Sequence, residues 1–178
     1  MRRRFFRGLT LVEMIIVMAL IAGTLTMATI SIGDWLTKSH QRNLVKALDS
    51  SIARARTEAI KRNTRVNICV SADQQTCTQG SWEKGWIIFP DTENSRTLEV
   101  NDAIIYHEAG DTFNHLTATG NQYVKSYLSF INNGKPQQLS GALQSGTIEV
   151  CARGQNVIKV FMAATGRTRI ENTSTLCP

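Results

Sequence analysis

Two arginines close to the C-terminus have the spacing of a phosphate-binding pair. Arg167 and Arg169 follow Gly166 and are separated by one threonine, so on an extended strand both would lie on one face. The forked guanidinium group suits phosphate oxygens, and such contacts carry no sequence information. The alternative is a hairpin turn at Thr165 and Gly166 with two solvated arginines. Glu171 would share the arginines' face and partly neutralise them.

The distribution of charge favours an anionic partner for this part of the chain. The net charge is +6 over 178 residues, but four arginines lie in the first seven positions, and without them 16 basic and 14 acidic side chains leave +2. Residues 73–112 hold two basic and eight acidic groups, whereas residues 113–178 hold six and two. A basic surface can steer an anionic partner, although most charged stretches are solvated surface. By charge alone, four further side chains could assist the two arginines: Lys125, Lys135, Arg153 and Lys159.

The number and position of the cysteines predict two disulfides in an exported domain. The chain has four cysteines, and all of them follow the apolar run of residues 9–33: Cys69, Cys77, Cys151 and Cys177. An even count of cysteines in an exported region is typical of disulfides. Of the three possible pairings we predict Cys69–Cys77 and Cys151–Cys177, because each pair would close one loop near the end of a strand. A zinc site is the rival interpretation, but the sequence has no Cys-x-x-Cys and no histidine near a cysteine.

The sequence lacks the motifs of common catalytic sites. It contains no His-Glu-x-x-His, no Gly-x-Ser-x-Gly and no phosphate-binding glycine loop. Its three histidines, His40, His107 and His115, belong to no such motif. We therefore predict no enzyme activity, no metal centre and no cofactor.

The N-terminal segment is long, apolar and preceded by positive charge. Between Leu9 and Gly33 the only ionisable side chain is Glu13, and the run is about as long as a helix needs to cross hydrocarbon. The preceding arginines favour a cytoplasmic N-terminus. An ordinary signal peptide is the alternative, but its apolar core would be shorter and a small-x-small cleavage site would follow. A carboxylate at membrane depth costs about 2.5–3.5 kcal/mol, so Glu13 either has a role or lies at headgroup level.

One helix is predicted from Thr10 to Arg62, because no proline or glycine cluster interrupts it. Its first half is apolar all round, and its second half is amphipathic. The stripe expected to pack on a sheet consists of Leu44, Leu48, Ile52, Ala55 and Ala59, with Ala47 and Ser51 beside them. The basic residues Arg42, Lys46, Arg56 and Lys61 lie largely off that stripe.

Beyond residue 63 the spacing of apolar residues shortens from the helical period to the two-residue period of strands. Alternating or apolar runs bounded by turn signals predict strands at residues 65–70, 85–90, 103–107, 126–131, 147–152, 157–163 and 168–171. Residues 132–134 and 164–166 are turn signals. The predicted fold class is α+β, with a long N-terminal helix packed on an antiparallel β-sheet domain.

The start of the chain resembles a known leader. The sequence Arg7-Gly8-Leu9-Thr10-Leu11-Val12-Glu13 is similar to the class III leader of type IV prepilins and type II secretion pseudopilins. The resemblance implies that a prepilin peptidase cuts between Gly8 and Leu9 and methylates the new amine of Leu9. It also implies that Glu13 neutralises the amine of a neighbouring subunit in the fibre, where either charge unpaired would be costly. The family most often has Phe at the position of Leu9.

The β-domain resembles one group within that family. Trp82, residues 85–89, residues 129–134 and residues 146–151 follow the order of elements in the minor pilins that include pseudopilin H, FimT and FimU. The Gly-Arg-x-Arg motif is similar to the DNA-binding motif of FimT pilins, which take up DNA in natural transformation. By this resemblance, Arg167 and Arg169 contact the phosphates of double-stranded DNA without sequence preference.

The resemblance thus implies a domain plan and two alternative functions. Residues 1–8 form the leader, 9–33 the transmembrane and fibre-core half of the helix, 34–63 its amphipathic half, and 64–178 a periplasmic β-domain. The chain would be an inner-membrane protein that enters a pilus with other pilins and binds DNA. The alternative is a purely structural minor pilin or a pseudopilin that primes filament assembly and binds no DNA.

Overall fold

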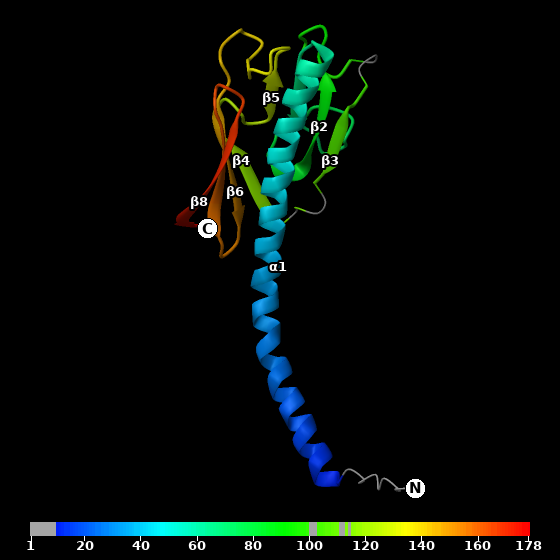
Figure 1. The fold of residues 1–178 in the computed structure, drawn as a ribbon, viewed down its shortest axis with the longest axis vertical. Helices are drawn as coiled ribbons and strands as arrows, with labels where there is room; N and C mark the ends of the chain where they lie inside the picture. Colours follow the sequence, from blue (N-terminus) through cyan, green and yellow to red (C-terminus); the bar gives the residue numbers. More distant parts are fainter. Residues whose placement is uncertain (1–9, 100–102, 111–112, 114) are drawn as a thin grey trace, which may run out of the picture. The chain divides into compact units, whose positions relative to one another are not determined.

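The computed structural model describes residues 10–178 except residues 100–102, 111–112 and 114, and the side chains of residues 24–32 are also not described. The chain divides into two compact units, Met1–Thr37 and Lys38–Pro178. Helix α1 (Leu11–Arg62) contributes to both units (Figure 1). The predicted leader, residues 1–8, and the predicted cleavage site at Gly8 and Leu9 lie outside the described residues.

In the first unit, α1 begins with a side-chain cap and presents apolar residues to its surroundings. The hydroxyl of Thr10 accepts a hydrogen bond from the Glu13 amide at 3.3 Å, and Thr-x-x-Glu is the spacing of a capping box. The large apolar side chains between Leu11 and Ile21 are 44–76% exposed. No helix in the part of the chain that the structure describes combines the length and apolar content required for a membrane crossing. The predicted span, residues 9–33, stays a prediction.

In the second unit, α1 ends where Asn63 adopts a left-handed backbone conformation, with φ of 51°. The Thr64 amide donates to the carbonyl of Ala59 and the Asn63 amide to that of Ile60, each at 3.3 Å. These are the two hydrogen bonds of a Schellman cap, and asparagine tolerates the left-handed conformation that this cap requires. The predicted end of the helix is thereby confirmed.

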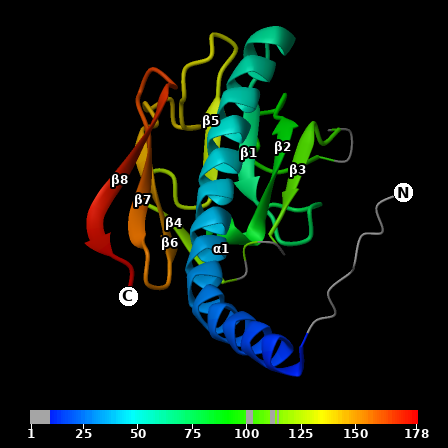
Figure 2. The same cartoon turned by 60° about the horizontal axis from the view of Figure 1, so that its bottom comes forward.

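The predicted stripe of α1 packs against the sheets. Leu44, Leu48, Ile52, Ala55 and Ala59 are each at most 2% exposed, and Ser51 is buried beside them. Figure 2 shows this part of α1, coloured cyan, in front of both sheets, with β1, β2 and β3 to one side and β4, β6, β7 and β8 to the other. Small residues in the stripe allow the strands to approach the helix closely.

Within the described residues, eight strands form two antiparallel four-stranded sheets. Sheet one has the order β3-β2-β1-β5 and consists of β1 (Val66–Val70), β2 (Gly85–Pro90), β3 (Tyr106–Ala109) and β5 (Tyr127–Phe130). Sheet two has the order β4-β6-β7-β8 and consists of β4 (Leu116–Gly120), β6 (Gly146–Ala152), β7 (Asn156–Met162) and β8 (Thr168–Leu176). A short 3-10 helix, η1 (Trp82–Lys84), precedes β2.

Three strands differ from the sequence prediction by more than one residue at an end. Strand β3 was predicted at 103–107 and lies at Tyr106–Ala109, and β4 was not predicted. Alternation in β4 involves only small residues beside Leu116, so its apolar signal is weak. Strand β8 was predicted to end at Glu171 but continues to Leu176, because pairing with β7 extends it through a polar segment.

Both predicted disulfides are present. Cys69 at the end of β1 bonds to Cys77 in the loop that follows, and Cys151 in β6 bonds to Cys177 just after β8. None of the four cysteines is free. The thiolate ligands that the rival zinc interpretation requires are therefore not available.

Candidate functional site

Of the predicted arginine pair, Arg167 lies on the turn between β7 and β8, and Arg169 lies in strand β8. The Gly166 amide donates to the carbonyl of Ala163 at 2.8 Å, and the Ala163 amide donates to the carbonyl of Arg167 at 2.9 Å. Gly166 has φ of 77°, and a Cβ atom there would lie 2.9 Å from the carbonyl oxygen of Gly134. Glycine is therefore required both for backbone conformation and for space. The predicted hairpin turn exists, and it fixes where the arginine that follows emerges.

Arg167 borders a pocket that the β7–β8 turn forms with α1. The pocket has a volume of about 460 Å³, and its helix side includes Arg56, Thr57 and Ile60. A Cβ atom at Gly134 would lie 3.2 Å from Nε of Arg56, so the Gly134 turn also reaches this helix side chain. The fold thus brings two arginines, 111 positions apart in sequence, to the lining of one pocket.

Neither of these two arginines is neutralised within the described residues. The ion pairs there involve Arg62, Lys61, Lys159 and Arg169 but neither Arg56 nor Arg167. No lining residue of the pocket carries a carboxylate. The hydroxyl of Thr168, the residue after Arg167, donates to the carboxylate of Asp49 on α1 and so holds the turn against the helix. Two unneutralised cations at one concave surface attract an anion.

Arg169 has different contacts from Arg167. Its guanidinium group lies over the ring of Phe161, 5.1 Å from the centroid, and Nη2 is 3.2 Å from Oε2 of Glu171. Strand β8 pairs Arg169 with Phe161, so both lie on the outer face of sheet two. The predicted interference from Glu171 is confirmed for Arg169 and does not extend to Arg167. Since the two side chains of this ion pair are 74% and 49% exposed, the pair is weak and leaves Arg169 reachable.

The four predicted helpers do not gather at one place. Lys159 pairs with Glu149 at 2.7 Å on the outer face of sheet two. Arg153 lies on the β6–β7 turn, at the opposite end of the strands from the β7–β8 turn. Lys125 borders another pocket. Lys135 alone follows the Gly134 turn that contacts Gly166.

Arg56 is the residue that sequence reasoning missed. Its position off the apolar stripe of α1 indicated only a solvated face. The Gly134 and Gly166 turns, packed on one another, lie beside this part of the helix only in the folded chain. No local sequence signal marks Arg56.

The other predicted site residue within the described part is Glu13. It lies in the first turn of α1, where the positive end of the helix dipole also stabilises a carboxylate. Its side chain is exposed, as are the apolar residues around it. Exposed apolar surface of this kind requires a cover of lipid or of other protein.

Histidines do not form a centre of their own. Nδ1 of His40 and Nε2 of His115 are 2.9 Å apart, and His107 stacks on Tyr106. Within the described residues no group of three or more His, Cys, Asp or Glu side chains could hold a metal ion.

Comparison with known proteins gives a consistent result. Residues 44–166 match the family model of type II transport protein GspH. The structure resembles two crystal structures of the type IV minor pilin FimU from Pseudomonas aeruginosa strain PAO1. Their identities are 18% and 19%, each match covers 78% of this chain and 96% or 98% of the other, and the TM-scores are 0.59 and 0.53. At these identities the likeness concerns the fold. No curated protein matches significantly.

Proposed function

The chain belongs to the type II transport protein GspH family of pilins and pseudopilins, and on this basis we propose that it is a FimT-like minor type IV pilin that binds DNA in natural transformation. As such, it contributes to pilus assembly and exposes the β7–β8 turn to DNA. The contact is to phosphates, so it has no sequence preference.

The proposed membrane topology follows from the N-terminal sequence. A prepilin peptidase removes residues 1–8, and the new N-terminal residue, Leu9, is methylated. The apolar half of the helix remains in the inner membrane with the N-terminus cytoplasmic and the β-domain periplasmic, until other pilins of the filament replace the lipid. The exposed apolar side chains between Leu11 and Ile21 support this, because lipid or neighbouring subunits would cover them.

The observation that carries the DNA-binding proposal is the unneutralised Arg167 on a rigid turn. Its side chain emerges from a turn fixed by Gly166 and by the Thr168–Asp49 hydrogen bond, so little backbone entropy is lost on binding. Arg169 adds a second contact if phosphate displaces Glu171. Two to four such contacts give a log–log salt slope of about −2 to −4.

The binding test uses the full-length chain in a non-ionic detergent and a fluorescent DNA duplex. Anisotropy should show binding that weakens with salt, and Arg167→Gln with Arg169→Gln should abolish it. The matched control is Arg42→Gln with Lys46→Gln, which removes the same charge from exposed positions on α1. In cells, a deletion strain complemented with the double arginine variant should transform far less often than one with the native chain.

A purely structural role is the second candidate, and the ion pairs on sheet two favour it. Glu149 and Glu171 offset Lys159 and Arg169, so the outer face of sheet two carries little net charge. A subunit that only primes or caps a pilus or a type II secretion pseudopilus would show no DNA binding even at low salt. That result would reject the DNA-binding proposal and leave filament assembly.

Assembly is tested at Glu13. Glu13→Gln keeps a residue suited to the capping box but removes the charge, so it separates the predicted pairing with a neighbour's amine from the local helix cap. Membrane insertion should be unchanged and incorporation into filaments impaired, as with Glu13→Ala. Normal incorporation of the Gln variant would show that the charge has no role in the fibre.

A further inference from the structure

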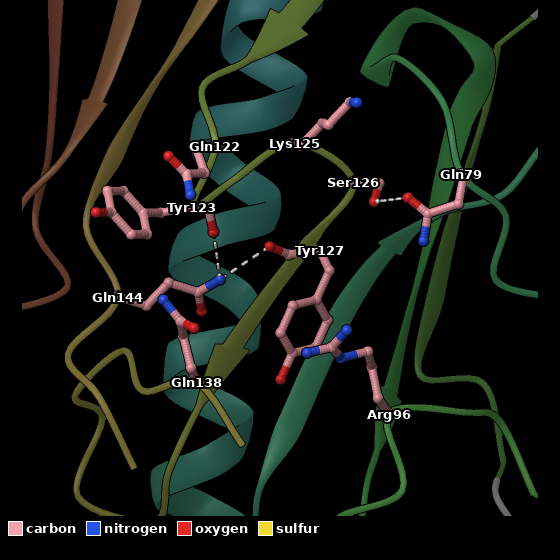
Figure 3. Close-up of a pocket in the computed structure, with 9 residues that line it drawn as sticks. All are labelled: Gln79, Arg96, Gln122, Tyr123, Lys125, Ser126, Tyr127, Gln138 and Gln144. Atoms are coloured by element: carbon pink, nitrogen blue, oxygen red, sulfur yellow. Dashed lines mark hydrogen bonds between the residues drawn. The ribbon is translucent and has the colours of Figure 1, made fainter. Parts of the chain in front are cut away.

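A second pocket, remote in sequence from the arginine turn, has the features of a ligand site. It lies where the loops after β1, β2, β4 and β5 meet the start of β5, and nine residues line a volume of about 300 Å³ (Figure 3). It shares no lining residue with the pocket beside Arg167. Nothing in the proposed function uses it.

The pocket is positively charged. Its lining includes Arg96 and Lys125 but no carboxylate. Among the described residues, neither cation takes part in an ion pair, and the guanidinium group of Arg96 has no hydrogen-bond acceptor there. The group lies over the ring of Tyr127, 4.6 Å from the centroid, as Figure 3 shows. This stacking fixes the plane of the guanidinium group and leaves its N–H donors available to an anion.

The loop that carries Arg96 is held in a strained conformation. Asn94 and Arg96 have φ of 56° and 69°, although neither is glycine. The buried carboxylate of Asp91 accepts hydrogen bonds from the amides of Ser95 at 2.9 Å and Arg96 at 3.3 Å, and from the side chain of Asn67 at 2.6 Å. Such strain persists only where the surroundings fix the backbone, and it is often found at ligand sites.

The opposite wall is fixed by a buried amide. Gln144 is fully buried, and its Nε2 donates to the carbonyls of Tyr123 at 2.8 Å and Tyr127 at 3.0 Å, while its Oε1 accepts from the Ser129 amide at 2.9 Å. Both sides of the pocket are thus organised before any ligand arrives, which lowers the entropy cost of binding.

The remaining lining groups match a hydroxyl-rich ring. The side-chain amides of Gln122 and Gln138 have no partner among the described residues, and each offers both donors and an acceptor, as sugar hydroxyl groups do. Tyr123 is 53% exposed and offers one flat apolar face. The buried hydroxyl of Tyr127 also lacks a hydrogen-bond partner among the described residues.

We propose that this pocket binds an acidic sugar unit, with Arg96 on the carboxylate and the glutamine amides on the hydroxyl groups; Lys125, whose ammonium group points away from Arg96 in Figure 3, contributes through its charge. A nucleotide is the less suitable ligand, because its base would need aromatic rings to stack on. Arg96 covers one face of the Tyr127 ring, and within the described lining no second free ring faces Tyr123. The proposal adds a carbohydrate-binding function to the filament subunit and does not depend on DNA binding.

The test is calorimetric titration of the full-length chain in a polyoxyethylene detergent, which has no sugar headgroup. A short oligogalacturonate should bind about tenfold or more tightly than neutral maltotriose, because charge-assisted hydrogen bonds are the strong ones. Arg96→Gln should remove that preference, and Lys125→Gln should reduce it. Gln122→Ala should weaken binding of both saccharides. Lys46→Gln removes one exposed charge elsewhere and should change nothing.

Three results would overturn the proposal: equal affinity for the acidic and neutral saccharides, tighter binding of thymidine monophosphate than of oligogalacturonate, or unchanged affinity in all three pocket variants with unaltered thermal unfolding. The Arg167→Gln with Arg169→Gln variant should keep its saccharide affinity. Failure of this inference is therefore distinguishable from failure of the DNA-binding proposal.

Discussion

Sheet one and sheet two use the same helix as a cover on one face but differ on the other. In sheet one, β1 is buried at all five positions, and the outer side chains of Cys69, Ile87 and Phe89 form a second apolar cluster. The Cys77 loop and the segments that contribute Leu98 and Ile104 cover this cluster. In sheet two the outer positions alternate with buried ones and stay half-buried or exposed.

The two outer faces therefore serve different purposes: the outer face of sheet one is packed, and the outer face of sheet two stays open to contacts. The covered face of sheet one gains apolar burial, which is the main stabilising term in folding. The open face of sheet two carries the ion pairs of Lys159 and Arg169 and ends at the turn that bears Arg167. Sheet one therefore buries more apolar surface, and sheet two keeps the exposed face on which the DNA-binding proposal rests.

The largest expected effect compares one phenylalanine from each outer face. Phe89→Ala should destabilise the second unit by about 3–5 kcal/mol, because the ring is fully buried and leaves a cavity. Phe161→Ala should cost about 1–2 kcal/mol, because its ring is only half-buried beneath Arg169. Denaturant unfolding followed by tryptophan fluorescence measures both. Equal losses would show that the outer faces do not differ in energy.

The disulfides provide a second comparison of the two sheets. The loops closed by Cys69–Cys77 and Cys151–Cys177 have sequence separations of 8 and 26. Chain entropy predicts that replacing each pair by alanine costs about 2.5 and about 3.5 kcal/mol. The same unfolding experiment applies. A greater loss at Cys69–Cys77 would mean that packing of Cys69 in the covered cluster outweighs loop entropy.

A smaller effect is expected from removing one acid of the open face. Glu171→Gln should raise duplex DNA affinity by about fivefold or less, because it frees Arg169 from an exposed ion pair. Stability should change by less than about 1 kcal/mol. The control is Glu93→Gln, an exposed acid outside sheet two. Unchanged affinity in anisotropy titrations would indicate that Arg169 does not contact phosphate.

The smallest effect concerns pH and the Cys77 loop beside sheet one. Hydrogen bonds from the Thr76 hydroxyl at 2.6 Å and the Thr76 amide at 2.8 Å, followed by those from Gln75 and Ser71, hold the pKa of Asp73 well below its usual range. A depressed folded-state pKa stabilises the chain above the unfolded value of about 3.9, and this contribution is lost as pH falls toward the folded value.

Asp73→Asn should therefore reduce stability slightly at neutral pH and flatten the decline below about pH 4. Carboxyl chemical shifts should show Asp73 still ionised at a pH below the unfolded value of about 3.9. Titration of Asp73 at the unfolded value would contradict the role of the Thr76 hydrogen bonds.

Much of the fold was predictable because its local signals agree with its packing. The i, i+4 stripe of α1, the apolar run of β2 and the glycine turns each match what the tertiary structure requires. Strand β4 and the end of β8 were missed, because their pairing depends on neighbours rather than on their own composition.

The candidate sites were less predictable than the fold. Arg167 and Arg169 could be found from their motif, and the interference of Glu171 from strand periodicity. Arg56 and Arg96 could not, because each gains its significance from a partner distant in sequence: the Gly166 turn for Arg56 and the ring of Tyr127 for Arg96.

In a filament under load, the Cys151–Cys177 bond has a mechanical consequence. Strand β7, strand β8 and the turn with Arg167 all lie inside the covalent ring that this bond closes. A load applied at Arg167 could peel β8 from β7, but the chain would stop lengthening once the ring is taut. Beyond that point the disulfide transmits the force to β6, a strand that is paired on both sides. The turn therefore resists extension as part of a covalently closed loop and not as a free C-terminal segment.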